Sequence, residues 1–144
     1  MVGDVHYAVG IGHVHQIVNP LPVTPLPHTP PEISGVADYR GDVVPILDLR
    51  ARFGLPPSPP SRSTRWILVN ARDRLVGLVV DSVPGVFGTN TDDVRATPSL
   101  GSGRDLRGIA GVTNHNGSLV FVLDVKRFTE IVDDIADILP PYDG

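Results

Sequence analysis

The chain has 144 residues, a formal net charge of −4 and no cysteine, and its twelve Lys and Arg are scattered along the sequence. This length fits one domain, or two very small ones packed together, and it is sufficient to bury a hydrophobic core. Without cysteine there is no disulfide framework and no thiol chemistry, and without a basic cluster we expect no nucleic-acid-binding surface.

The N-terminal residues MVGDVHYAVG contain no basic segment followed by an apolar one, so they do not resemble a secretory signal. No apolar run approaches the roughly 18 residues of a membrane span. We therefore expect a cytoplasmic protein that does not insert directly into a membrane. The fifteen Pro and fifteen Gly predict many short elements separated by turns.

The apolar pattern of AVGIGHVHQI (residues 8–17) returns 69 residues later in GLVVDSVPGV (residues 77–86). In both copies the spacing between apolar residues begins at two and then becomes three. This change predicts a strand whose alternation is broken by a bend or a bulge. After the first copy, the Pro-rich segment NPLPVTPLPHTPP (residues 19–31) predicts an extended crossover between two strands.

A second repeat is closer in sequence. GVADYRGDVVPILDLRARFG (residues 35–54) matches GVTNHNGSLVFVLDVKRFTE (residues 111–130) at six of twenty positions, 76 residues apart. Asn116-Gly117 lies between apolar runs and is a strong hairpin signal, because both residues tolerate positive φ. Each copy therefore predicts a strand, a tight turn and a second strand. The Asp that follows the second predicted strand of each copy, Asp48 or Asp124, can cap a short helix, and Pro45 predicts an edge strand or a bulge.

The two repeats together predict two similar β units in tandem. The first occupies residues 1–60 and the second residues 65–144, with a Pro/Ser-rich connector at residues 55–63. Near the C-terminus, apolar residues recur with helical spacing from Phe128 to Leu139 and stop at Pro140. This spacing predicts one amphipathic helix of about eleven residues.

For each group of residues that could carry out chemistry, a structural explanation is the better one. His13 and His15 could share one strand face as metal ligands, but nothing supplies a third ligand at a useful spacing. Asp92-Asp93 predicts a turn rather than a catalytic acid pair. The glycine-rich residues 101–108 lack the ending of a phosphate-binding loop. The sequence therefore predicts a protein that is not an enzyme and has no catalytic, metal or cofactor site.

Three segments carry a resemblance to known proteins: GVADYRGDVVPILDLRARFGLP, the preceding VTPLPHTPPEISGV, and LVGLVVDSVPGVF with DDVRATP after it. In these segments the chain resembles the CheW-like coupling proteins of bacterial chemotaxis arrays, from Tyr7 to about Phe128. The resemblance implies two five-stranded SH3-like barrels packed together with a C-terminal helix. It also implies an adaptor, recruited to receptor arrays, that connects the cytoplasmic tip of a methyl-accepting chemoreceptor to a histidine autokinase.

The resemblance also implies where partners bind. In the family, the receptor tip docks in an apolar groove between the barrels, and the regulatory domain of the kinase docks mainly on barrel one. Arg40 matches the family's characteristic arginine, for which a structural role in tying the turn to the adjacent strand is the alternative. Gln16 stands where the family often has an acidic residue, so the groove is expected to be more positive than usual. The expected apolar contacts, each with barrel core as the alternative, are Val14, Val36, Val83 and Val86.

One strand of the second unit has no visible counterpart in the first. The strand TRWILVN (residues 64–70), shifted by 69 residues, falls at positions −5 to +1. We therefore expect barrel one to be one strand short, with an open edge that favours self-association, and kinase binding to be weak or lost. Two alternative functions stay open: a structural array component, and a stand-alone relative of a kinase regulatory domain.

Overall fold

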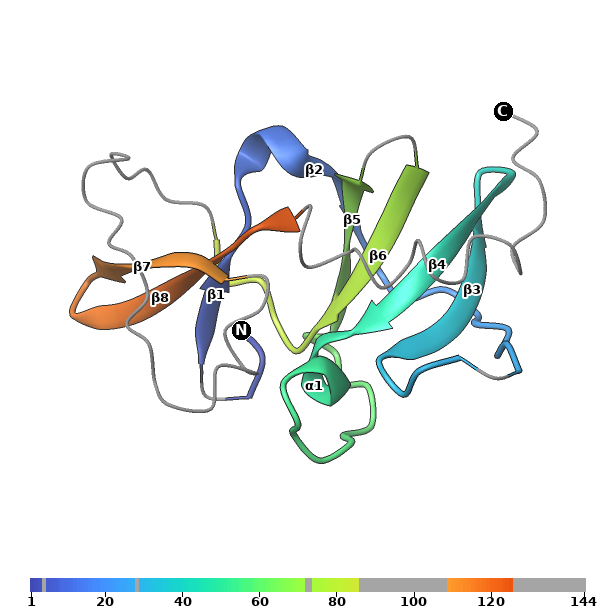
Figure 1. Ribbon diagram of the computed structural model, residues 1–144, viewed down its shortest axis with the longest axis horizontal. Helices are drawn as coiled ribbons and strands as arrows, with labels where there is room; N and C mark the ends of the chain where they lie inside the picture. Colours follow the sequence, from blue (N-terminus) through green and yellow to red (C-terminus); the bar gives the residue numbers. More distant parts are fainter. Residues whose placement is uncertain (4, 28, 72–73, 86–108, 126–144) are drawn as a thin grey trace.

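The computed structural model describes residues 1–3, 5–27, 29–71, 74–85 and 109–125. These residues form a mostly β fold of two sheets with one short α-helix (Figure 1), as the sequence predicts. The elements in chain order are β1 (His6–Ala8), the 3-10 helix η1 (Ile11–His13), β2 (Val14–Val18), β3 (Ile33–Tyr39), β4 (Asp42–Asp48), α1 (Leu49–Arg52), β5 (Arg65–Ala71), β6 (Arg74–Val80), β7 (Ile109–His115) and β8 (Ser118–Leu123). The predicted C-terminal helix, the Asp92-Asp93 pair and the loop at residues 101–108 lie outside the described residues.

The larger sheet has the strand order β2-β5-β6-β4-β3, and a side-chain contact brings its two end strands together. Tyr39, at the end of β3, donates a hydrogen bond from its hydroxyl to Oε1 of Gln16 on β2, at 2.7 Å. Because β2 and β3 stand at the two ends of the strand order, this bond spans the closure. The barrel interior is filled by buried side chains of β3, β4 and β5, namely Ala37, Tyr39, Val44, Ile46, Trp66 and Leu68.

Both predicted hairpins are confirmed. Arg40-Gly41 joins β3 to β4 with φ values of 51° and 89°, and Asn116-Gly117 joins β7 to β8 with φ values of 52° and 83°. Positive φ at both central residues is the two-residue turn that matches the twist of the strands. In each turn a side chain two residues before the turn accepts a hydrogen bond from the glycine amide, Asp38 at 2.9 Å and Asn114 at 3.1 Å.

The position of Pro45 differs from the prediction of an edge strand. The strand that contains it, β4, lies between β3 and β6. Pairing of β4 with β6 begins only at Ile46, so the missing amide of Pro45 interrupts no ladder on that side. The irregularity falls instead on β3, whose register shifts between Ile33 and Gly35.

The smaller sheet has the order β1-β8-β7. Each of the two sheets contains strands from both repeat units. Strand β1 pairs in parallel with β8, and β4 pairs in parallel with β6. Each sheet therefore contains strands from both sides of the connector at residues 55–63, which is mostly exposed and contains no strand or helix. The assignment of one whole barrel to residues 1–60 and another to residues 65–144 stays a prediction.

The first copy of the bent strand is divided between the two sheets. Its first residue, Ala8, ends β1 in the smaller sheet, and its last residues lie in β2 at the end of the larger sheet. Between them, η1 turns the chain, and the amide of His13 donates to the carbonyl of Gly10 at 2.9 Å. The change in apolar spacing thus marks a crossing from one sheet to the other (Figure 1).

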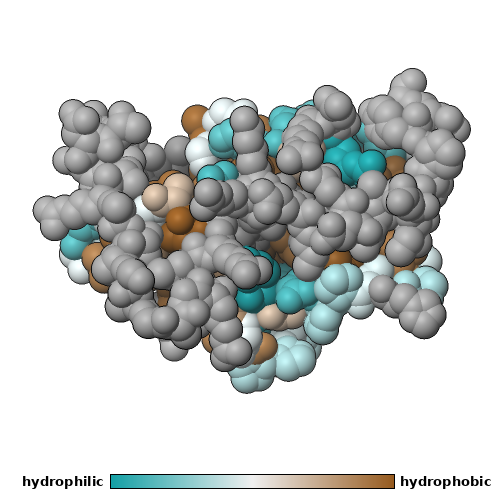
Figure 2. All heavy atoms as spheres, in the orientation of Figure 1, coloured by the Kyte–Doolittle hydropathy of each residue, from teal (hydrophilic) through white to brown (hydrophobic). Residues whose placement is uncertain are grey.

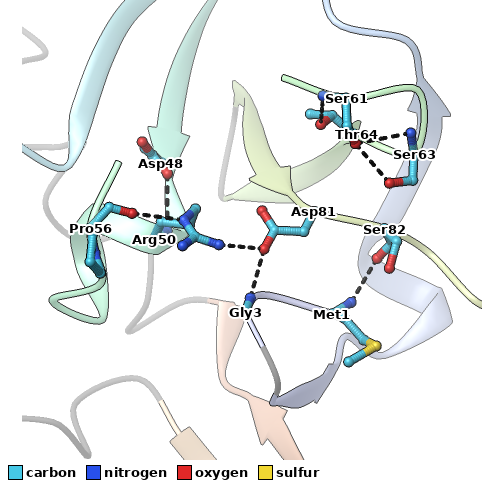
Figure 3. Close-up of polar contacts among 10 residues, drawn as sticks. All are labelled: Met1, Gly3, Asp48, Arg50, Pro56, Ser61, Ser63, Thr64, Asp81 and Ser82. Atoms are coloured by element: carbon cyan, nitrogen blue, oxygen red, sulfur yellow. Dashed lines mark hydrogen bonds and ion pairs between the residues drawn. The ribbon is translucent and has the colours of Figure 1, made fainter. Parts of the chain in front are cut away.

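A polar network fixes α1 against the end of β6 (Figure 3). Asp48 caps the helix, as predicted, by accepting from the amide of Arg50 at 2.9 Å. The Arg50 guanidinium pairs with Asp81 at 2.6 Å and also donates to the carbonyl of Pro56 at 2.9 Å. The same Asp81 oxygen accepts from the amide of Gly3 at 2.7 Å, so one carboxylate connects three segments distant in sequence.

Candidate functional site

A polar cluster lies beside the first hairpin turn. The guanidinium of Arg40 sits 5.3 Å from the centre of the Tyr39 ring, which is a cation–π arrangement. The edge of the same ring faces His15 at 6.2 Å, and its hydroxyl is bonded to Gln16. Arg40, His15 and Gln16 are exposed, whereas Tyr39 is buried. Two of the predicted site residues, Arg40 and Gln16, are thus brought together through an aromatic ring that the sequence argument did not single out.

A second feature is an apolar cavity of about 520 Å³ between the two sheets. Val14 and Ile17 of β2, Leu78 of β6, Val122 of β8 and the segment Ser82–Gly85 contribute to its lining. Cavities of this size and character are typical of ligand and partner sites. Two further residues that the sequence predicted as partner contacts, Val14 and Val83, line this cavity.

The strand β2 connects the polar cluster to the cavity. Its pairing with β5 shifts register between Val14 and Gln16. In a regular strand Val14 and Gln16, two positions apart, would point to the same face of the sheet. The bulge between them turns their side chains to different faces. Val14 therefore lines the cavity while Gln16 meets Tyr39, and Ile17 returns to the cavity.

The remaining predicted residues do not join these two features. Val36 lies on β3, where its amide and carbonyl both pair with Thr24 of the Pro-rich crossover, and its half-buried side chain packs against the core between the sheets. This environment fits the alternative role of Val36 as barrel core. Val86 lies outside the described residues.

Sequence reasoning did not identify three residues that line the cavity beside Val14. Tyr7 stacks on Phe53 with ring centres 4.4 Å apart, and its burial raises the pKa of its hydroxyl. Ile11, in η1, is 75% exposed although it borders the cavity. Ile17 is 41% exposed. An exposed aliphatic pair at the mouth of an apolar cavity is typical of a protein contact surface.

On the face in view, apolar residues are visible at several places in the coloured part of the surface (Figure 2). In the described part of the chain, no group of three His, Cys, Asp or Glu side chains is placed to hold a metal ion. None of the described helices is long and apolar enough to cross a membrane. The cavity and the neighbouring polar cluster are therefore the features that best fit a binding site.

Comparison with known proteins gives a consistent result. Residues 1–132 match the CheW-like domain. The chain is 32% identical over 124 residues to the chemotaxis protein CheW of Rhizobium meliloti (strain 1021), which covers 86% of this chain and 80% of that protein. It is 31% identical over 128 residues to the chemotaxis protein CheW of Helicobacter pylori (strain ATCC 700392 / 26695), covering 88% and 76%.

A solved structure is similar over nearly the same length. The crystal structure of the scaffolding protein TtCheW from Thermoanaerobacter tengcongensis matches with a TM-score of 0.82 and 25% sequence identity, covering 90% of this chain and 88% of that one.

Proposed function

The chain belongs to the CheW-like family, and from this premise we propose that it is a non-enzymatic adaptor that binds the cytoplasmic tip of a methyl-accepting chemoreceptor. The observation that carries the proposal is the family match over residues 1–132, which includes both the polar cluster and the cavity. As an adaptor of chemotaxis signalling, the protein acts through surfaces rather than through a reaction. We further propose that it works in the cytoplasm, at receptor arrays.

The geometry supports receptor binding between the two sheets. Protein interfaces combine an apolar centre with a few polar anchors, among which arginine is frequent. The cavity supplies the apolar centre through Val14 and Val83, and Arg40 supplies an exposed cation. Gln16 is neutral and its carbonyl oxygen already accepts from Tyr39. The cation of Arg40 is therefore not neutralised by the residue at position 16, and we expect the groove to favour an acidic partner surface.

The direct test is calorimetric titration of the chain with a chemoreceptor cytoplasmic fragment. Arg40→Glu should weaken binding by about 2 kcal/mol or more, near thirtyfold, because an arginine anchor is removed and its charge reversed. The matched control is Asn116→Glu, which places the same residue at the same position of the second hairpin, where φ is 52° rather than 51°. This control should bind as the unmodified chain does. Equal affinity of Arg40→Glu and the unmodified chain would remove Arg40 from the interface.

Kinase binding forms a separate part of the proposal. Kinase binding is expected to be weak because the sequence predicts an open edge in the barrel that carries the first hairpin. Among the described residues, the sheet that carries this hairpin has five strands, and β1 lies instead at one edge of the three-stranded smaller sheet. Titration with the kinase regulatory domain, beside a second CheW-like protein as reference, decides the matter. Binding weaker than the reference fits an adaptor whose main contact is the receptor, and equal binding would contradict the expectation of a weak kinase contact.

Kinase activity measured with the chain added, beside the same titrations, separates the two alternative functions. A structural array component would bind neighbouring array proteins without altering kinase activity. A relative of the kinase regulatory domain would bind CheW-like proteins in place of the kinase itself.

A further inference from the structure

The connector at residues 55–63 carries a sequence pattern that its role as a link between the two repeat units does not require. Its residues LPPSPPSRS place two proline pairs three positions apart and a cation two positions after the second pair. A segment that only spans a distance needs a length and a stiffness, and neither of these fixes the position of a charged residue. The spacing of Pro57, Pro60 and Arg62 is therefore not explained by the role of a connector.

The prolines restrict the backbone of the connector to an extended conformation. Each proline fixes its own φ at about −65°, and the residue before a proline is pushed toward the polyproline II region. Every residue from Leu55 to Pro60 is a proline or stands directly before one. The structure agrees with this expectation, because residues 55–61 contain neither helix nor strand and belong to a loop that projects below α1 in the view of Figure 1.

The pattern also has the period of a polyproline II helix, in which residues three apart share one edge because a turn has three residues. Two neighbouring edges carry the prolines and the cation, namely Pro56, Pro59 and Arg62 on one and Pro57 and Pro60 on the other. The third edge begins with Leu55 and continues with two serines. Leu55 is half-buried and packs against the core between the sheets, whereas all four prolines are exposed. The proline edges are therefore accessible to a partner.

Both ends of the segment are held by hydrogen bonds (Figure 3). At its start, the amide of Leu55 donates to the carbonyl of Arg50 at 2.8 Å, and Nε of Arg50 donates to the carbonyl of Pro56 at 2.9 Å. At its end, the amide of Ser61 donates to Oγ1 of the buried Thr64 at 2.8 Å. A partner therefore meets a segment that is already extended, and less conformational entropy is lost on binding.

Arg62 supplies the charged end of the segment. It occupies a central position of the turn that the amide of Thr64 closes by donating to the carbonyl of Ser61 at 3.2 Å. Its own carbonyl accepts from the guanidinium of Arg65 at 2.7 Å, so the backbone is fixed here while Arg62 remains exposed. A cation at one end gives an apolar segment a direction, because a carboxylate of the partner can pair only with that end.

The other Pro-rich segment, residues 19–31, differs in both respects. Pro22 and Pro25 have the same spacing of three, but the segment contains no Lys or Arg. Its backbone is bonded to β3 through Thr24 and Val36, at 2.8 and 2.9 Å. The comparison separates the pattern of the connector from proline content alone.

From these observations we propose that residues 56–62 form a docking segment for another protein, whose groove is lined with aromatic rings and flanked by a carboxylate. Aromatic-lined grooves bind Pro-x-x-Pro segments in the polyproline II conformation, which is preformed here. The proline edges fill the groove, and Arg62 pairs with the carboxylate and sets the direction of binding. The segment is separate from the proposed receptor site, because none of residues 55–63 lines the cavity.

The test is calorimetric titration of the 144-residue chain with an isolated SH3 domain that selects Pro-x-x-Pro-x-Arg ligands. Saturable binding at one site is expected. Combined Pro57→Ala and Pro60→Ala removes the apolar contacts of one edge and should weaken binding at least about tenfold. Arg62→Glu should weaken it to a similar extent, because a carboxylate then faces a carboxylate. The matched controls are Ser58→Ala, on the third edge, and Pro22→Ala, in the other Pro-rich segment, and both should bind as the unmodified chain does.

Urea unfolding checks that each variant keeps its fold, and all of them should unfold as the unmodified chain does because the changed residues are exposed. Absence of saturable binding, or equal binding of the double proline variant and the unmodified chain, would overturn the proposal. An equal loss in Pro22→Ala would also overturn it, because binding would then follow proline content. The double variant should still bind the chemoreceptor fragment, so failure of this proposal is distinguishable from failure of receptor binding.

Discussion

Tyr39 shows how one residue can serve both the fold and the candidate site. Its ring is buried in the barrel, its hydroxyl spans the barrel closure to Gln16, and its face lies under the Arg40 guanidinium. The two explanations given for Arg40, a structural arginine and a binding arginine, are compatible in this geometry. The ring orients the side chain, and the exposed guanidinium keeps its charge available to a partner.

Tyr7 gives a prediction of pH dependence. Burial raises the pKa of its hydroxyl above the ordinary value of 10.0, so the folded protein holds this proton more tightly than the unfolded chain does. The resulting stabilisation is present below pH 10 and is lost as the pH rises through the folded pKa. Tyr7→Phe retains the stacking on Phe53 but has no proton to lose. Its free energy of unfolding should therefore fall less between about pH 9 and pH 12 than that of the unmodified chain.

Urea unfolding of both proteins across this range makes the comparison. Because every other titrating group is shared, the difference between the two pH profiles isolates Tyr7. Parallel profiles would show that the Tyr7 hydroxyl is solvated in the folded protein.

At the scale of elements, the Pro-rich crossover is held to the barrel at Gly35. Thr24 and Val36 pair through two hydrogen bonds of 2.8 and 2.9 Å, which brings the crossover backbone against β3. A Cβ atom on Gly35 would lie 2.2 Å from the carbonyl oxygen of Thr24, and the φ of 144° is itself unfavourable for other residues. Both effects make glycine necessary at this position.

Gly35→Ala should therefore destabilise the fold by about 3 kcal/mol, at the upper end of ordinary single substitutions. The matched control is Gly12→Ala, where an added Cβ meets no neighbouring atom and φ is not positive. Chemical denaturation of both variants measures the difference. Equal stability of the two variants would show that the crossover is not fixed against β3 in solution.

The elements differ in how far the sequence predicted them. The hairpins were predictable because their turn chemistry is local, with Gly41 and Gly117 supplying positive φ. The cap at Asp48 was predictable for the same reason. The parallel pairing of β4 with β6 was not, since it joins strands across the connector and depends on long-range packing. For this reason Pro45 indicated an edge strand or a bulge, and β4 lies inside the sheet, with the register shift on its partner strand β3.

The candidate site was predicted in part, for a related reason. The change in apolar spacing at Val14 and Ile17 indicated a bend, and both residues line the cavity that forms where the chain crosses between the sheets. Nothing in the spacing indicated that Tyr39 would connect Gln16 to Arg40, because that contact depends on barrel closure. The packing of Val36 against Thr24 is likewise a tertiary contact.

In the whole molecule, the repeat produces two related sheets, each built from strands of both repeat units, and the cavity lies between them. A surface at such a junction is well suited to an adaptor, because a bound partner contacts both halves of the duplication. The polar network of Arg50, Asp81 and Gly3 also joins the two halves of the duplication (Figure 3).

We propose that a receptor tip docks between the two sheets, and hydrogen exchange measured with and without a chemoreceptor cytoplasmic fragment is the decisive test. When the fragment is bound, exchange should slow in the cavity segments at residues 10–17 and 78–85. The hairpin tip at residues 114–119, which includes no residue of the cavity lining, serves as the internal control and should exchange at an unchanged rate. Protection of the hairpin tip with no change in the cavity segments, or no protection at saturating fragment, would contradict the account.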